Sequence, residues 1–201
     1  MGVMEINIIY DDHTALIVVD VQNDFADPSG SLYVKEGEQV VPLINTEIER
    51  AKSAGSFVVY TRDWHPGSTP HFSKDGGIWP VHCVMHTWGA EFHPGLAVDG
   101  PEVKKGSGGE DGYSGFSMRD PETDEVTPTE LERMLRKRHI TRLAIAGLAT
   151  DYCVKATALD GLSHGFETQL LTRAIRPVDL EPGDGRRAIG EVVAAGGGAL
   201  Y

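Results

Sequence analysis

The alternation of short apolar runs with amphipathic stretches constrains this chain more than any other feature of its sequence. The apolar runs, many of them rich in β-branched residues, lie at 15–19, 56–62, 101–106, 142–147, 167–172 and 199–201. Strands that alternate with helices in this way are typical of a mostly parallel sheet covered by helices. The sequence therefore predicts an α/β fold.

Helix signals lie between these runs. Apolar residues recur every three or four positions in 39–53, which predicts a helix there. Thr127 followed by Pro128 predicts the N-cap and the first residue of a second helix. A third helix is expected over 148–165, directly after an apolar run, and a fourth around 188–193.

Length and charge bound the organisation of the chain. Its 201 residues are expected to form one domain spanning 1–201. The longest unbroken apolar run is too short to cross a bilayer and the N-terminal sequence lacks a secretion-signal pattern, so a cytoplasmic location is expected. Eighteen Lys and Arg residues against thirty Asp and Glu residues give a formal net charge of −12, which opposes binding to nucleic acid or to an anionic membrane. A homo-oligomer is compatible with this composition.

Reactive side chains follow several of the apolar runs. Asp20 and Asp63 each stand at the end of one, and Cys153 lies in the first turn of the helix that follows 142–147. Ligands of open α/β sheets bind outside the carboxyl ends of the strands, so we expect these groups to share a pocket. A helix start favours a thiolate, and Asp20 offers a base beside it. The alternative is that Cys153 is a packed apolar residue.

Lys105 stands at the end of the run 101–106. A lysine near a thiol and a carboxylate would lower the thiol pKa and hold the carboxylate in place. The alternative is a solvated surface lysine, the usual place for this residue type.

A second group of polar residues comprises Asp63, His65, His71 and His82, which lie within twenty residues of one another. Imidazoles with one carboxylate suit zinc, iron or manganese better than calcium or magnesium. The spacing therefore predicts a divalent transition metal site in the segment 63–100, which has no clear periodicity and is long for a plain connection. The alternative is a loop whose histidines only form hydrogen bonds.

Aromatic residues accompany both groups. Trp79 and Phe72 lie in the same aperiodic segment, Tyr113 lies in the glycine-rich loop 106–116, and Phe25 follows the first apolar run. Such side chains can line a pocket for a flat ring, although each alone is more often part of a core.

These residues lie within blocks that resemble the nicotinamidase/pyrazinamidase enzymes of the isochorismatase-like cysteine hydrolase superfamily. The blocks are ALIVVDVQNDF (15–25), TRDWHP (61–66), PHFS (70–73), GGIWPVHC (76–83), GAEFHPGL (89–96), VKKG (103–106), YSGF (113–116) and GLATDYCVKATALD (147–160). They occur in the family's order and at compatible spacings, and the resemblance runs nearly from end to end of the chain. The resemblance implies a three-layer α/β/α sandwich with a central, mostly parallel sheet of about six strands.

The resemblance also implies roles for individual residues. It makes Asp20, Lys105 and Cys153 a catalytic triad, and it selects Lys105 over Lys104 because glycine follows the family's catalytic lysine. A cis peptide bond between Leu148 and Ala149 would aim the backbone N–H groups of Ala149 and Cys153 at the oxyanion. The implied metal ligands are Asp63, His65, His71 and His82, and the implied substrate contacts are Phe25, Trp79, Tyr113 and Leu148.

The activity implied by the resemblance is metal-dependent hydrolysis of nicotinamide, and also of pyrazinamide, through a cysteine thioester. The expected partner would be the small aromatic amide, with no nucleic acid and no membrane. Three alternatives remain open at this point. The chain could be an isochorismatase-like hydrolase of another small amide or carbamoyl compound, a metallohydrolase in which Cys153 only packs, or a binding module without catalysis.

Overall fold

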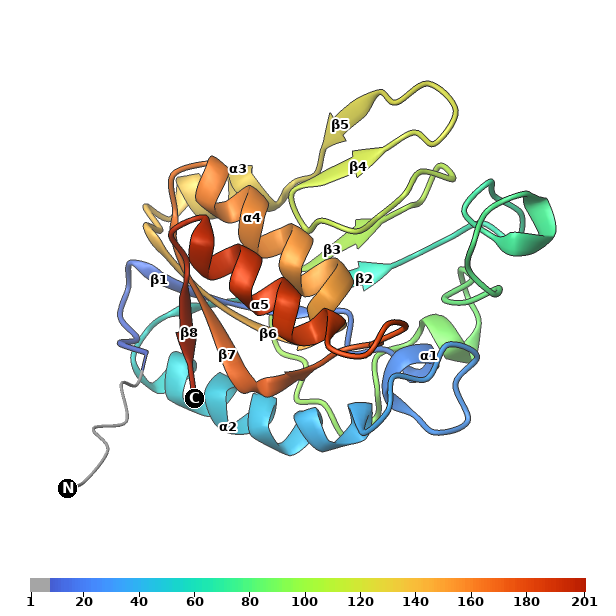
Figure 1. The fold of residues 1–201 in the computed structure, drawn as a ribbon. Coiled ribbons are helices and arrows are strands. Elements are labelled where there is room, and N and C mark those ends of the chain that lie inside the picture. Colours follow the sequence, from blue (N-terminus) through green and yellow to red (C-terminus); the bar gives the residue numbers. More distant parts are fainter. Residues whose placement is uncertain (1–7) are drawn as a thin grey trace.

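A six-stranded sheet forms the centre of the computed structural model, which describes residues 8–201 (Figure 1). Its strand order is β3-β2-β1-β6-β7-β8, and every neighbouring pair is parallel. The strands are β1 (Thr14–Val19), β2 (Phe57–Asp63), β3 (Glu102–Lys105), β6 (Arg142–Leu148), β7 (Glu167–Arg176) and β8 (Gly198–Leu200). The predicted parallel sheet of about six strands is confirmed.

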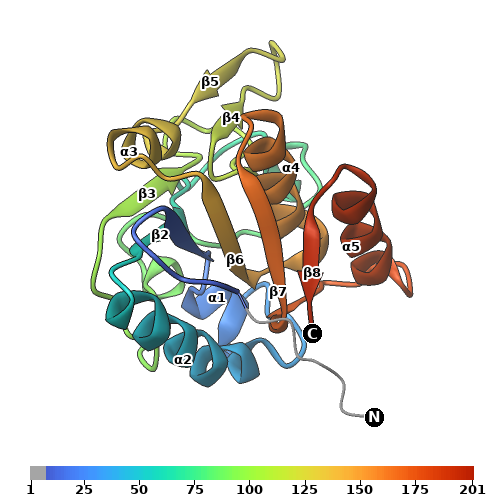
Figure 2. The same ribbon diagram turned by 90° about the vertical axis from the view of Figure 1, so that its left-hand side faces the viewer.

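Helices cover both faces of this sheet, because successive strand residues point to opposite sides. In β1, Leu16 and Val18 pack in the core beneath α2 (Val40–Ser53). Ile17 and its neighbours at alternate positions pack in the second core. That core lies beneath the helices on the other face, which are α3 (Leu131–Lys137), α4 (Lys155–Ser163) and α5 (Asp184–Ala194). Figure 2 shows the resulting three layers, and the predicted sandwich is confirmed.

A small antiparallel hairpin, absent from the sequence-based expectation, projects from this body (Figure 1). It pairs β4 (Ser117–Arg119) with β5 (Val126–Pro128). The prediction that Thr127 caps a helix is therefore wrong, since Thr127 pairs with Met118 in the hairpin. Thr129 stabilises the start of α3 instead, because its hydroxyl accepts a hydrogen bond from the Leu131 amide N–H at 3.1 Å.

The segment between β2 and β3 contains no long regular element. Its only helical turns are η2 (Ser73–Asp75) and η3 (Trp88–Ala90). A short helix, α1 (Asn23–Ala26), and a turn, η1 (Gly37–Gln39), lie between β1 and α2. Within residues 8–201, no helix combines the length and the apolar character needed to cross a membrane.

Candidate active site

Asp20 directly follows β1 at the carboxyl edge of the sheet. Its φ of 47° lies in the left-handed region, which Asp tolerates better than most residues. The buried carboxylate accepts hydrogen bonds from the Thr61 hydroxyl and from the Lys105 ammonium, both at 2.7 Å. Burial raises the pKa of Asp20 to about 6, even though the Lys105 charge acts to lower it. This carboxyl can therefore exchange a proton near neutral pH.

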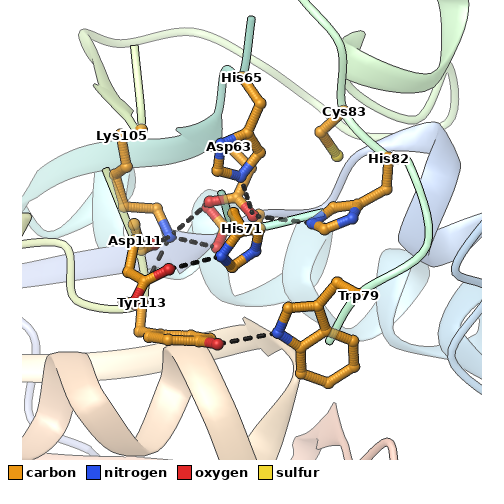
Figure 3. A network of polar contacts seen from close by, with 12 residues as sticks. Asp63, His65, His71, Trp79, His82, Cys83, Lys105, Asp111 and Tyr113 are labelled. Carbon is orange, nitrogen blue, oxygen red and sulfur yellow. Dashed lines mark hydrogen bonds and ion pairs between the residues drawn. The ribbon is translucent and has the colours of Figure 1, made fainter. Parts of the chain in front are cut away.

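Lys105 ends β3, and its ammonium lies beside the carboxylate of Asp63 (Figure 3) and that of Asp20. Its Nζ lies 2.7 Å from Asp20 Oδ2 and 2.9 Å from Asp63 Oδ1, and it also donates to the Gly112 carbonyl. Burial disfavours the ammonium, but the two carboxylates outweigh burial and hold the pKa of Lys105 well above its usual value. The alternation of β3 sends the adjacent Lys104 outward, where it pairs with Glu102 at 3.3 Å.

Cys153 lies in a π-helical turn (Thr150–Val154) that follows β6. Its sulfur and a carboxylate oxygen from each of Asp20 and Asp63 lie within 4.8 Å of one another. Burial raises the pKa of Cys153 well above its usual value, although the Lys105 charge opposes this. Asp20 and Asp63 also raise this pKa, so the thiolate expected from the sequence is disfavoured by burial and by two neighbouring carboxylates. The sulfur needs a base to remove its proton.

The four residues predicted to bind a metal converge beside Lys105 (Figure 3). One ring nitrogen from each of His65, His71 and His82 lies within 4.8 Å of the others. Asp63 Oδ2 is 3.7 Å from His65 Nε2 and 3.8 Å from His82 Nε2. All four side chains are buried.

The protonation states of Asp63 and His82 favour the binding of a cation. Burial opposes the charge on Asp63, but Lys105 and His65 hold the pKa of Asp63 well below its usual range. Burial lowers the pKa of His82 to about 4, although the Asp63 charge opposes this. The site therefore offers an ionised carboxylate and, at His82, an uncharged imidazole with a free lone pair.

Hydrogen bonds behind the imidazoles select the nitrogen that can bind a metal. His71 Nδ1 lies 2.7 Å from Asp111 Oδ1, and His82 Nδ1 lies 2.7 Å from the Pro80 carbonyl oxygen. Such bonds occupy Nδ1 and leave Nε2 for a ligand. Within residues 8–201, neither ring nitrogen of the buried His65 has a hydrogen-bond partner. An unpartnered buried donor among two oriented imidazoles and a carboxylate fits zinc, iron or manganese.

A pocket opens between Cys153 and the histidines. Phe25, Trp79 and Tyr113 line it, as predicted. The Trp79 indole N–H donates to the Tyr113 hydroxyl at 2.8 Å. The rings of Trp79 and Tyr152 pack edge to face, with their centroids 4.8 Å apart. These contacts hold the aromatic side chains as walls of a narrow slot, which suits a flat ring.

Leu148 does not line this pocket. It is fully buried in the core on the α2 face of the sheet, and its contact with substrate stays a prediction. The cis peptide bond that the resemblance implies between Leu148 and Ala149 is present. Ala149 and Cys153 both line the pocket, while the role of their N–H groups stays a prediction.

Several residues that shape the site were not foreseen. The side chain of Gln22 holds the backbone of Asp63 in place. Gln22 Nε2 donates to the Asp63 carbonyl at 2.7 Å, and Gln22 Oε1 accepts from the Asp63 amide N–H at 2.8 Å. Thr61 holds Asp20 at 2.7 Å. Strand periodicity carries a signal for Thr61, which precedes Asp63 by two residues and therefore shares its face of β2. Tyr152 and Asp111 had no comparable signal, because neither the π-helical turn of Tyr152 nor the loop of Asp111 follows a simple sequence period.

This chain is similar to known proteins over most of its length. The family model for the isochorismatase domain matches residues 14–197. The nicotinamidase of Escherichia coli (strain K12) is 36% identical over 200 residues, covering 90% of this chain and 92% of that protein. The solved pyrazinamidase of Pyrococcus horikoshii in complex with zinc is 42% identical, with a TM-score of 0.83, covering 94% of this chain and 99% of that one.

A second solved structure, PnC1 of L. infantum in complex with nicotinate, is 32% identical, with a TM-score of 0.86 and coverage of 96% of both chains. The similarity thus extends over nearly the full length of each of these relatives. The chain belongs to the isochorismatase domain family, within which it is similar to the nicotinamidases and pyrazinamidases.

Proposed function

We propose that this protein is a metal-dependent amidohydrolase, a single domain over 1–201, that converts nicotinamide to nicotinic acid and ammonia and also accepts pyrazinamide. The observation that carries the proposal is that one aromatic-walled pocket joins Cys153 to the histidine cluster. The relatives support it, since one is a nicotinamidase, one was solved with zinc and one with nicotinate.

Asp63, His65, His71 and His82 would hold the divalent metal. When bound, a zinc, iron or manganese ion supplies a Lewis acid for the pyridine nitrogen, directly or through water, and so orients the ring. The walls formed by Phe25, Trp79 and Tyr113 would hold the ring flat. This arrangement would place the carboxamide beside Cys153.

The first half of the reaction forms a thioester. Asp20 takes the Cys153 thiol proton as the sulfur attacks the carboxamide carbon, and the carbonyl electron pair moves to oxygen. The backbone N–H groups of Ala149 and Cys153 stabilise that oxyanion. As the oxyanion collapses, the C–N bond breaks and Asp20 returns the proton to the leaving nitrogen, which departs as ammonia.

The second half regenerates the enzyme. Asp20 removes a proton from a water molecule, whose oxygen attacks the thioester carbon. The C–S bond then breaks, the sulfur recovers the proton from Asp20, and nicotinic acid leaves. Throughout, Lys105 supplies the fixed positive charge that balances Asp20 and Asp63.

Ammonia release from nicotinamide by the purified, metal-loaded protein tests the assignment directly. Release at the same rate as substrate loss is expected, with nicotinic acid as the second product. If metal-loaded protein releases no ammonia from nicotinamide or pyrazinamide, the substrate assignment is overturned and another small amide or carbamoyl compound takes its place.

The rate should fall in acid. Asp20 acts as a base only when ionised, and burial has raised its pKa to about 6. We expect kcat/KM for nicotinamide to fall about tenfold per pH unit below that value, since protonation removes the base. Steady-state rates between pH 4.5 and 8 measure this, with tryptophan fluorescence at each pH showing that the protein stays folded. A rate independent of pH across this range would exclude Asp20 as the base.

Removal of the metal should weaken substrate binding. We expect purified protein to contain zinc, iron or manganese, and chelation to raise KM for nicotinamide because the ring nitrogen loses its anchor. His65→Ala should reproduce the loss of metal, whereas His93→Ala should not, since His93 lies in the same segment but outside the cluster. Metal content by mass spectrometry, with rates before and after metal is restored, measures both effects. Full activity of chelated protein would contradict the expectation.

A further inference from the structure

Asp111 is a buried carboxylate directly behind His71 (Figure 3). It lies in the glycine-rich loop between β3 and β4, and its Oδ1 is 2.7 Å from His71 Nδ1. It does not line the pocket and is not within the histidine cluster itself. Its contact is therefore with a candidate ligand and not with the substrate.

Arg119 holds Asp111 from the other side. The second carboxylate oxygen, Oδ2, accepts a hydrogen bond from Arg119 Nη2 at 3.0 Å. The backbones of the two residues also exchange hydrogen bonds, at 2.7 Å and 3.1 Å, where the loop meets β4. Arg119 in turn pairs with Asp124 at 2.8 Å in the hairpin connection. The Asp111 carboxylate is thus fixed in position, with one oxygen committed to each neighbour.

This contact determines which nitrogen of His71 carries the proton. A neutral imidazole has one N–H, and a carboxylate can only accept, so the proton resides on Nδ1. The lone pair is then on Nε2, the nitrogen not engaged by Asp111. His82 is set in the same way by the Pro80 carbonyl, while His65 has no such partner.

We propose that Asp111 is a positioning residue that holds His71 in the Nδ1–H tautomer and thereby sets the affinity of the site for its divalent metal. This rests on the proposed function of Asp63 and the three histidines as a metal site. Carboxylates that accept a hydrogen bond from a ligand histidine raise metal affinity by orienting the ring and fixing its tautomer, and their loss typically weakens binding about 10–100-fold.

Asp111→Asn is the informative variant, because Arg119 determines the orientation of the side-chain amide introduced at position 111. Arg119 is a donor and requires the amide oxygen, which leaves the amide NH₂ facing His71. That group can only donate to Nδ1, which forces the ring proton onto Nε2 and removes the lone pair from the metal side. We expect Asp111→Asn to bind Zn²⁺ about 10–100-fold more weakly than the unaltered protein, measured by competition with a chromogenic chelator.

A matched control is available in the same loop. Glu110→Gln also removes one negative charge, but the Glu110 carboxylate bonds only the Gly108 amide, at 2.8 Å. Its zinc affinity should equal that of the unaltered protein. Urea unfolding in chelator should give the same midpoint for Asp111→Asn and the unaltered protein, because a positioning role acts only when metal binds.

A double variant distinguishes positioning from a structural role. In Asp111→Asn/Arg119→Met no donor constrains the amide, so it can turn its oxygen toward His71 and restore the Nδ1–H tautomer. The double variant should therefore bind Zn²⁺ more tightly than Asp111→Asn alone. A lost structural contact would instead make the double variant weaker than either single change.

Three results would overturn the proposal: unchanged zinc affinity in Asp111→Asn, no recovery in the double variant, or a fall in the unfolding midpoint of metal-free Asp111→Asn that accounts for the loss of zinc affinity. If Asp111→Asn cannot be purified, Asp111→Ala serves, compared with Glu110→Ala in the same loop. Loss of the carboxylate that accepts from His71 Nδ1 should weaken zinc binding, and unchanged affinity would overturn the proposal. None of these measurements uses nicotinamide, so a protein that binds zinc as expected but releases no ammonia would fail the proposed function and leave this inference intact.

Discussion

Replacing Cys153 with alanine should abolish ammonia release from nicotinamide, lowering kcat by about 10⁴-fold or more. The reason is that the thioester route has no other nucleophile, since the sulfur beside Asp20 is the atom that forms the covalent bond. An enzyme-coupled ammonia assay on the unaltered protein and Cys153→Ala measures the effect. Acid quenching during turnover should also leave a nicotinoyl group on the peptide that contains Cys153.

Cys83→Ala is the matched control, because Cys83 is the only other cysteine and is also buried. Its sulfur faces the Gly89 carbonyl at 3.9 Å, away from the pocket lining. This variant should retain most of the activity. If Cys153→Ala kept most of its rate instead, the cysteine route would be wrong and a water-based metallohydrolase mechanism would replace it.

Replacing Lys105 with methionine should destabilise the protein by about 3–5 kcal/mol and remove its activity. The change deletes the ammonium that lies within 2.9 Å of both the Asp20 and the Asp63 carboxylates. Two buried carboxylates without a countercharge repel each other, and at least one of them must take up a proton. Urea unfolding monitored by fluorescence, in chelator so that metal binding does not contribute, measures the loss.

The neighbouring lysine gives the control. Lys104→Met removes the same charge one residue earlier, where the side chain is partly exposed and pairs with Glu102. The free energy of unfolding should change by no more than about 0.5 kcal/mol. A loss below about 1 kcal/mol in Lys105→Met would show that the buried cluster does not depend on this ammonium.

The sequence predicted the residues of the site best where sheet geometry places them. Asp20, Asp63, Lys105 and Cys153 each stand at or just after the end of a strand, and parallel strands bring those ends to one edge. The proximity of Asp20, Asp63 and Cys153 therefore followed from the strand assignments, whereas the family resemblance selected Lys105 over Lys104. The histidine cluster was foreseen as a group of suitable residues, but its convergence depends on a segment without regular structure.

The features that were missed depend on local packing. Thr127 and Thr129 have similar helix-start signals, and pairing of β5 with β4 decides between them. The thiol pKa at Cys153 was misjudged because the helix start is visible in the sequence, whereas the depth of burial is not. Asp111 gave no signal, because its meeting with His71 depends on how two loops fold over the same edge.

The order of the strands determines which forms of this protein can be active. The four neighbouring strands β3, β2, β1 and β6 each contribute one group, Lys105, Asp63, Asp20 and Cys153, although these residues are far apart along the chain. A fragment shorter than the stretch from Asp20 to Cys153 cannot bring them together, and neither can a sheet in which these four strands are unpaired. On the proposed mechanism, specific activity therefore counts the molecules in which these four strands are paired, and species without that pairing dilute it without contributing to it.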